Sequence, residues 1–244
     1  MPLAPRSTLH FFVMYYREPI TADMLIWAYA NGVFPMADSR GGHVQWYSAD
    51  PRAILPLDRF HVSHSLRKRV RRGQYTIRFD TAFDEVIRRC AQPRRDEGDT
   101  WINDQIVDGY CRLYERGIAH SVEAWRRRAG EQESRRAGEP DSSLGIGHLS
   151  LVIEGEGGAE ELVGGLYGVA MGGAFFGESM FSLATDASKV CLVHLIEHLR
   201  RRGYQLLDVQ MNSRHMAQFG TIDIPRRQYM RRLKAALRLA ATWE

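Results

Sequence analysis

The chain has 244 residues, of which 44% are hydrophobic, and its formal net charge is only +4. These values are typical of a globular protein with a sizeable core, built as one large or two small domains. No apolar run approaches the roughly 20 residues of a membrane span, and the opening apolar patch is too short for a secretory signal. The 3 cysteines have no metal-ligand spacing. We therefore expect a cytoplasmic protein with reduced thiols, no membrane span and no bound metal.

Residues 1–60 are predicted to form a small N-terminal module. Thr21 is a suitable N-cap for a short helix, and Gly32 follows where that helix should stop. Two short apolar pieces, at 44–47 and 53–55, have the length and composition of strands. The module therefore combines one helix with short strands.

A basic helix is predicted from Ser63 to Arg72, with an apolar stripe of only Leu66 and Val70. So thin a stripe leaves most of the helix facing water or a ligand. Clusters of one charge sign suit phosphate backbones, although a solvated helix face is the commoner cause of one such run. The cations of this helix are Arg67, Lys68, Arg69, Arg71 and Arg72. A second basic cluster comprises Arg226, Arg227, Arg231, Arg232, Lys234 and Arg238.

The middle of the chain alternates between strands and helices. Alternating apolar residues predict strands at Tyr75–Phe79 and His120–Arg126. Helical spacing predicts one helix over Thr81–Ala91 and a second that Asn103 caps and that ends at Gly117. The charged stretch at 127–143 is predicted to be a loop. Two strands are predicted after it, at 148–154 and 162–170, with a turn between them.

A glycine-rich apolar stretch at 166–182 carries a single charge, Glu178. Burying an unpaired carboxylate costs several kcal/mol, so Glu178 is paired, exposed in a cleft or active in chemistry. A helix is predicted at Asp186–Arg202, with Asp186 as a candidate N-cap, and a strand at Tyr204–Met211.

A strand–helix–strand unit of this kind should cross over right-handedly and pair its strands in parallel. Asp208 and Gln210 then share one face of the second strand, and they can meet Glu178 in one crevice. The alternative is that Asp208 and Gln210 are solvated positions on a half-exposed strand.

Short motifs in a fixed order give this arrangement a precedent. The motifs are WYSADPRAIL at 46–55, DTWI at 99–102, AHSVEAW at 119–125, FFGESMFS at 175–182, DVQ at 208–210 and IPRRQY at 224–229. With these motifs, the chain resembles leucyl/phenylalanyl-tRNA–protein transferases between Thr21 and Tyr229. The resemblance implies an α+β protein. Its small N-terminal module is followed, at 61–244, by a catalytic domain like the Gcn5-related acetyltransferases, with an inserted loop or hairpin extension at about 127–161.

The resemblance also implies a reaction and its partners. Leu, Phe or Met passes from aminoacyl-tRNA, chiefly leucyl- and phenylalanyl-tRNA, to the α-amine of proteins that begin with Arg or Lys. A peptide bond forms, and the product is marked for degradation by the N-end rule. Because the ester is already activated, no ATP, metal or other cofactor is needed. We expect a monomer.

Site residues follow from the same resemblance. Asp208 and Gln210 correspond to a relay near the reacting amine, although the leaving tRNA hydroxyl could shuttle the proton instead. Glu178 corresponds to the acid that binds the substrate's α-amine or the cationic acceptor. Trp101 and Tyr110 correspond to positions that meet the aminoacyl-adenosine end. The side-chain pocket corresponds to Leu166, Phe175, Met180, Leu195, Leu199 and Leu207, some of which could be core instead.

One departure from the family pattern and two competing functions remain open. Met36 stands where the family has an adenine-stacking Trp, and Trp46 or Tyr47 could substitute for it. The runner-up function is a CoA-dependent N-acetyltransferase, which normally shows a [QR]-x-x-G-x-[GA] loop that this sequence lacks. A non-catalytic RNA-binding protein would explain the basic helices, but not three polar residues on convergent strands.

Overall fold

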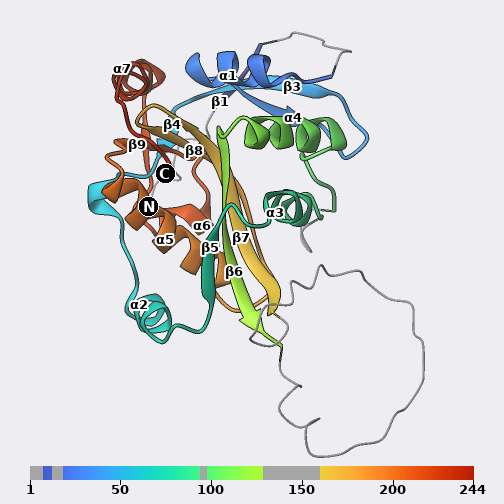
Figure 1. The fold of residues 1–244 in the computed structure, drawn as a ribbon. Coiled ribbons are helices and arrows are strands. Elements are labelled where there is room, and N and C mark those ends of the chain that lie inside the picture. Colours follow the sequence, from blue (N-terminus) through green and yellow to red (C-terminus); the bar gives the residue numbers. More distant parts are fainter. Residues whose placement is uncertain (1–7, 13–18, 94–97, 129–159) are drawn as a thin grey trace, which may run out of the picture.

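We analysed a computed structural model that describes residues 8–12, 19–93, 98–128 and 160–244. Within these residues the strands form two sheets, one of three strands and one of seven (Figure 1). The predicted strand at 148–154, and almost all of the extension predicted at about 127–161, lie outside the described residues.

The smaller sheet is antiparallel, with β3 (Val44–Asp50) between β1 (Thr8–Phe12) and β2 (Phe34–Ala37). Helix α1 (Ala22–Ala30) begins as expected, because the Thr21 side chain accepts a hydrogen bond from the Met24 amide at 3.2 Å. Strand β3 confirms the strand predicted at 44–47 and extends three residues further, to Asp50.

The larger sheet has the order β10-β4-β9-β8-β7-β6-β5. Among the described strands, only β8 and β9 pair in parallel, and the helix between them supplies the crossover that the sequence predicted. The strands are β4 (Arg52–Ile54), β5 (Thr76–Phe79), β6 (Ala119–Arg127), β7 (Glu160–Met171), β8 (Ala174–Ser182), β9 (Leu206–Asp208) and β10 (Ile222–Ile224). Because β4 belongs to this sheet, residues 52–54 pack with the larger unit, and the division at residue 60 stays a prediction.

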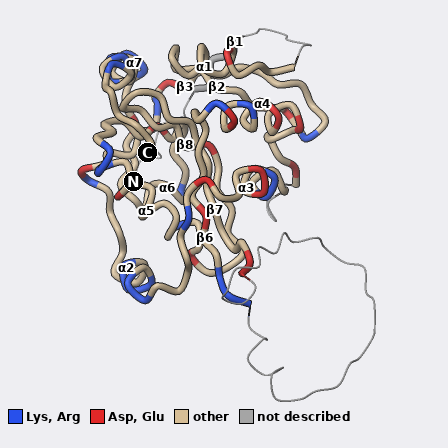
Figure 2. Tube along the Cα trace, viewed as in Figure 1, with Lys and Arg blue, Asp and Glu red and all other residues tan. Residues whose placement is uncertain are grey.

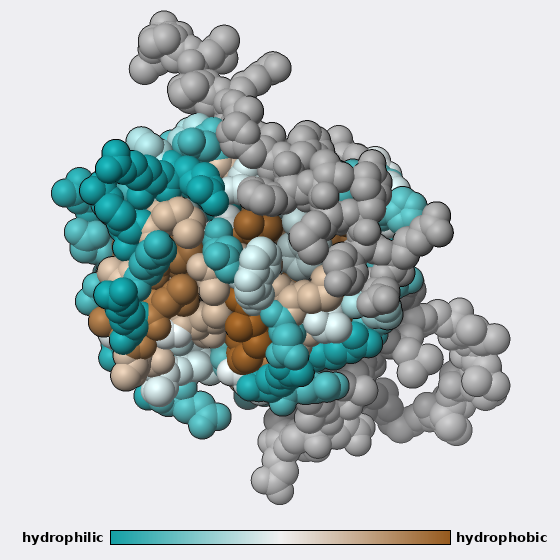
Figure 3. Space-filling model, turned by 90° about the horizontal axis from the view of Figure 1, so that it is seen from above, coloured by the Kyte–Doolittle hydropathy of each residue, from teal (hydrophilic) through white to brown (hydrophobic). Residues whose placement is uncertain are grey.

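Helices cover both faces of the larger sheet. In Figure 1, α3 and α4 lie on one side of β6 and β7, and α5 lies on the other. Two apolar clusters result, one on each side. Seen from above, apolar side chains gather in the middle of the surface between hydrophilic borders (Figure 3). Besides the 3-10 turn at Leu57–Arg59, the remaining helices are α2 (His64–Arg71), α3 (Phe83–Cys90), α4 (Asp104–Glu115), α5 (Ala187–Arg201), α6 (Arg214–Ala217) and α7 (Arg226–Ala236).

Two local expectations need correction. The strand predicted at Tyr204–Met211 ends at Asp208, because the chain turns there and Gln210 adopts a left-handed φ of 54°. Asp186 occupies the N-cap position of α5, but its side chain makes no capping bond and pairs instead with Arg69 and Lys189. Asn103, in contrast, caps α4 through a 3.0 Å bond from the Ile106 amide. None of the three cysteines forms a disulfide, and no helix in the described segments has the length and apolarity to cross a membrane.

Gly168 provides a test of the packing between β7 and β8. A Cβ atom there would lie 2.3 Å from the Phe176 carbonyl oxygen, which belongs to the neighbouring backbone and cannot move aside. Gly168→Ala should therefore lower the free energy of unfolding by about 1–3 kcal/mol in urea denaturation. Gly41→Ala is the control, since nothing lies within 4 Å of its Cβ position. Equal midpoints for the two variants would contradict the tight strand contact.

Candidate active site

Glu178 is the extra residue of a β-bulge. In the pairing of β7 with β8, Gly168 faces Gly177 and the preceding Tyr167 faces Ser179, so Glu178 has no partner across the ladder. A bulge re-aims the side chain of the unpaired residue and is common beside active sites. Here it places Glu178 on the wall of a large cavity.

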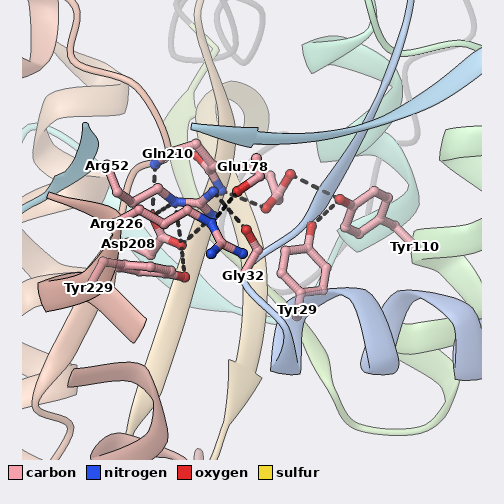
Figure 4. A network of polar contacts seen from close by, with 10 residues as sticks. Tyr29, Gly32, Arg52, Tyr110, Glu178, Asp208, Gln210, Arg226 and Tyr229 are labelled. Carbon is pink, nitrogen blue, oxygen red and sulfur yellow. Dashed lines mark hydrogen bonds and ion pairs between the residues drawn. The ribbon is translucent and has the colours of Figure 1, made fainter. Parts of the chain in front are cut away.

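Two neutral donors hold the Glu178 carboxylate (Figure 4). The Tyr110 hydroxyl donates to Oε2 at 2.9 Å, and the Gln210 side-chain amide donates to Oε1 at 2.9 Å. Behind it, the hydroxyls of Tyr29 and Tyr110 are hydrogen-bonded to one another. The carboxylate is therefore oriented by hydrogen bonds, without a cation in direct contact among the described residues.

Burial raises the pKa of Glu178 to about 7, and the nearby charge of Asp208 acts in the same direction. Hydrogen bonds from Tyr29 and Tyr110 and the charge of Arg52 oppose this shift. Burial and the Glu178 charge also raise the pKa of both tyrosines well above the usual value, so their hydroxyls stay protonated. Near neutral pH, Glu178 can therefore either hold a proton or attract a cation.

Asp208 lies behind the cavity wall and is fully buried. Its carboxylate accepts bonds from Arg52 Nε at 2.9 Å and Nη2 at 2.7 Å, and from the Tyr229 hydroxyl at 2.6 Å. The backbone amide of Gln210 donates a further bond at 2.9 Å. These donors occupy both carboxylate oxygens, so Asp208 acts on the cavity through Gln210.

Arg52 completes this buried cluster. Its guanidinium lies 4.7 Å from the ring centroids of both Phe34 and Tyr229, and its Nη1 donates to the Gly32 carbonyl at 3.1 Å. Arg52 was not predicted as a site residue, although it lies within the motif at 46–55. Nothing in the periodicity of that segment indicates a partner 156 positions further along the chain.

The cavity has a volume of about 630 Å³ and is lined mostly by apolar side chains. Among the residues expected in the side-chain pocket, Leu166, Met180, Leu195 and Leu207 line it. Phe175 and Leu199 do not: both are fully buried, and the Phe175 ring stacks on Trp243 at 5.5 Å between centroids. These two residues are core, which was the alternative considered for part of the set.

The aromatic residues expected at the adenosine end lie in two different layers. Trp101 lines the cavity together with Met36, the residue that replaces the family's Trp. Tyr110 supports Glu178 from behind and does not line the cavity. Trp46 and Tyr47 are buried away from the lining. Of these candidate positions, Met36 and Trp101 are the two that line the cavity.

Several polar lining residues were missed by the sequence analysis. Two lie within the FFGESMFS motif, one lies in the first turn of α5, and three follow the DVQ motif. Position within or after these motifs is the only sequence signal that the five residues outside α5 carry. They are Ser179, Ser182, Ser188, Asn212, Ser213 and His215.

The predicted basic helix exists as α2 and is exposed on its charged side. Arg69 is committed to other contacts, because it pairs with Asp186 at 3.0 Å and bonds Gln74 at 2.8 Å. Figure 2 shows α2 as one of the blue, cation-rich segments. The exposed cations that remain are Arg67, Lys68, Arg71 and Arg72.

Known proteins of one family resemble this chain over most of its length. The family model described as leucyl/phenylalanyl-tRNA protein transferase matches residues 54–131 and 154–234, and the model of its N-terminal domain matches residues 18–50. A leucyl/phenylalanyl-tRNA–protein transferase of Rubrobacter xylanophilus is 47% identical over 90% of this chain and 96% of its own length. Proteins with the same description from Paramagnetospirillum magneticum and Gloeobacter violaceus are 46% and 44% identical over 90% of this chain, and cover 90% and 95% of their own lengths.

A solved structure, L-PGS from Bacillus licheniformis, matches with a TM-score of 0.37 and 15% identity, over 66% of this chain and 46% of that one. That score is too low to carry an argument. The sequence matches identify the class of the protein as an aminoacyltransferase. The mixed α/β fold, with a polar pair on the wall of an apolar cavity, is compatible with that class. The chain belongs to the leucyl/phenylalanyl-tRNA–protein transferase family, and its reaction is tRNA-dependent aminoacyl transfer to proteins.

The raised pKa of Glu178 makes a prediction about stability and pH. An unfolded glutamate has a pKa of about 4.3, so between about pH 4 and 7 the folded state binds the proton more tightly. Stability from this group is therefore present at acid pH and is lost as pH rises through about 7. Relative to Glu178→Gln, which cannot ionise, the wild type should lose about 2–3 kcal/mol between pH 5 and 8. Urea denaturation of both proteins measures this, and a pH-independent difference would contradict it.

Proposed function

We propose that the chain transfers Leu, Phe or Met from aminoacyl-tRNA to the α-amine of proteins that begin with Arg or Lys. The observation that carries the proposal is the Glu178–Gln210 pair on the wall of an otherwise apolar cavity. An apolar cavity suits an unbranched-at-Cβ hydrophobic side chain, and a carboxylate on its wall suits an ammonium or guanidinium group.

Gln210 is positioned to assist the attacking amine. Because its Nε2 donates to Glu178, its Oε1 lies at the other end of the amide and can accept a hydrogen bond from the amine. The amine nitrogen then attacks the ester carbonyl, the C–N bond forms, and the bond to the tRNA 3′-oxygen breaks. The amine's proton passes to that oxygen, which leaves as the 3′-hydroxyl of the tRNA. Positioning contributes most here, since an α-amine with a pKa of about 8 needs only a modest base.

Asp208 is a positioning residue in this proposal. It does not line the cavity, but its carboxylate accepts a hydrogen bond from the backbone amide of Gln210 and so fixes the turn at the end of β9. Glu178 binds the cationic group of one substrate, either the donor's α-ammonium or the acceptor's N-terminal side chain. Trp101, Met36 and the exposed cations of α2 are proposed to meet the adenosine and the RNA backbone of the donor.

Further parts of the proposal concern fold and context. The β8–α5–β9 crossover supports a larger domain like that of the Gcn5-related acetyltransferases. Since the donor is an aminoacyl-tRNA, the reaction belongs to the cytoplasm, where the product enters N-end rule degradation. The monomeric state stays a prediction. Membership of the transferase family leaves no observation in favour of an acetyl-CoA enzyme or a non-catalytic RNA-binding protein.

Gln210→Ala tests the relay. It should slow single-turnover transfer from leucyl-tRNA to an Arg-starting peptide by about 10²–10⁴-fold, while tRNA affinity is unchanged. Gln205→Ala is the matched control, because Gln205 is an exposed residue just before β9. Peptides that begin with Ala should not be modified by any of the proteins. Wild-type rates in Gln210→Ala would remove this residue from the mechanism, and equal use of Ala peptides would remove the proposed acceptor.

Asp208→Asn tests whether the buried ion pair between Asp208 and Arg52 stabilises the region that positions Gln210. The change leaves the buried Arg52 guanidinium without its counter-charge, which typically costs about 3–5 kcal/mol. Asp223→Asn, on the exposed edge strand β10, should change the free energy of unfolding by less than about 0.5 kcal/mol. Denaturant unfolding of the two variants compares them directly. An Asp208→Asn protein as stable as Asp223→Asn would show that the ion pair does not hold this region together.

A further inference from the structure

Helix α7 presents a row of cations to solvent. Arg227, Arg231 and Lys234 are exposed within the helix, and Arg238 is exposed in the turn that follows it. Their spacing of four, three and four residues places them in one stripe at 3.6 residues per turn. We call these four residues the α7 stripe. The opposite side of the helix is buried and contains Tyr229, Leu233 and Ala236.

No carboxylate neutralises the α7 stripe within the described part of the chain. Helix α7 contains no acidic residue, and none of the ion pairs found between described residues includes a member of the stripe. Four arginines elsewhere on the surface do have carboxylate partners: Arg88 with Asp84, Arg89 with Glu85, Arg116 with Asp23 and Arg126 with Glu161. The stripe is therefore a row of positive charges that no neighbouring carboxylate balances among the described residues.

This unbalanced charge opposes folding of the free protein. Arg227 and Arg231 are four residues apart on one helix, and like charges at that spacing destabilise the helix by a few tenths of a kcal/mol. Arg227 also lies in the first turn, where the helix dipole disfavours a cation. A feature that costs stability in the free protein is consistent with a role in binding an anion.

The stripe is separate from the basic helix α2. In Figure 2 the blue segments of α7 and α2 lie at opposite ends of the molecule. The three members within the helix span about 10 Å along its axis, which is long enough to meet consecutive phosphates of a nucleic-acid strand. The proposed donor is a polyanion of this kind and is much larger than the cavity that receives its end.

We propose that the α7 stripe is a second docking surface for the RNA backbone of the donor tRNA. The inference rests on the proposed function, which names that donor. On the buried side of the same helix, the Tyr229 hydroxyl donates to Asp208 at 2.6 Å, and Asp208 holds Gln210. Docking on the stripe therefore secures the helix that supports the relay from behind.

The test is charge removal from the stripe. Arg227→Gln, Arg231→Gln, Lys234→Gln and Arg238→Gln together take the formal net charge from +4 to 0. The matched control is Arg88→Gln, Arg89→Gln, Arg116→Gln and Arg126→Gln, which removes the same charge from paired positions. Leucyl-tRNA affinity is measured for both proteins over a series of salt concentrations.

The stripe variant should bind leucyl-tRNA at least about tenfold more weakly in 50 mM salt, and the slope of log affinity against log salt should fall by about 2–3. The control variant should stay close to the wild type. A third variant, Arg67→Ala with Lys68→Ala and Arg71→Ala, tests α2, and its loss should add to that of the stripe variant. Without RNA, the stripe variant should melt no lower than the wild type, since repulsion is relieved.

Two results would overturn the proposal. The first is a stripe variant whose affinity and salt slope match those of the charge-matched control. The second is unchanged tRNA binding together with loss of binding to anionic phospholipid vesicles, which would assign the stripe to a membrane surface. Transfer by the wild-type protein is measured separately. An active wild type with an unaffected stripe variant refutes the docking surface alone, whereas an inactive wild type refutes the proposed function.

Discussion

The buried ion pair between Arg52 and Asp208 connects the parts of the molecule that form the site. Arg52 comes from β4, Asp208 from β9 and Tyr229 from α7, while the Gly32 carbonyl after α1 accepts from the same guanidinium. Desolvation makes such a pair a poor source of net stability, but removal of either partner leaves an unpaired buried charge. Its value lies in specificity, because few other arrangements of these four elements satisfy both charged groups. The direction in which Gln210 points depends on that arrangement.

Glu178 differs from Asp208 in every respect that matters for chemistry. Asp208 is fully buried, is saturated by donors and faces a permanent cation. Glu178 lies on the wall of a cavity, where it is partly buried and is held by neutral donors. Because no cation contacts it among the described residues, the desolvation of its carboxylate raises its pKa to about 7. One carboxylate thus organises the scaffold, and the other stays responsive to an arriving cation. This division of roles is the pattern expected where two acids of one site have different environments.

Local signals predicted local structure well. Thr21 and Asn103 cap the helices that the sequence predicted, and the parallel β8–β9 pair confirms the crossover. The candidate site was predicted less completely, since its key contacts join residues far apart in sequence. No periodicity reveals that Arg52 pairs with Asp208, or that a bulge isolates Glu178. The resemblance placed Phe175 and Leu199 in the pocket, but both are buried in the core, and a sequence motif does not distinguish an apolar core residue from an apolar cavity residue.

The bulge at Glu178 also sets the parity of the β8 strand. Before it, Phe175 and Gly177 lie opposite Ala170 and Gly168, and after it Met180 lies opposite Leu166 on that same face. In a regular strand, residues separated by an odd number would face opposite ways, and Met180 would lie on the opposite side of the sheet from Phe175 and Gly177. Side chains in this stretch can therefore vary in kind more freely than the stretch can vary in length. Loss or gain of a single residue would reverse the side of the sheet that every later side chain of the strand faces.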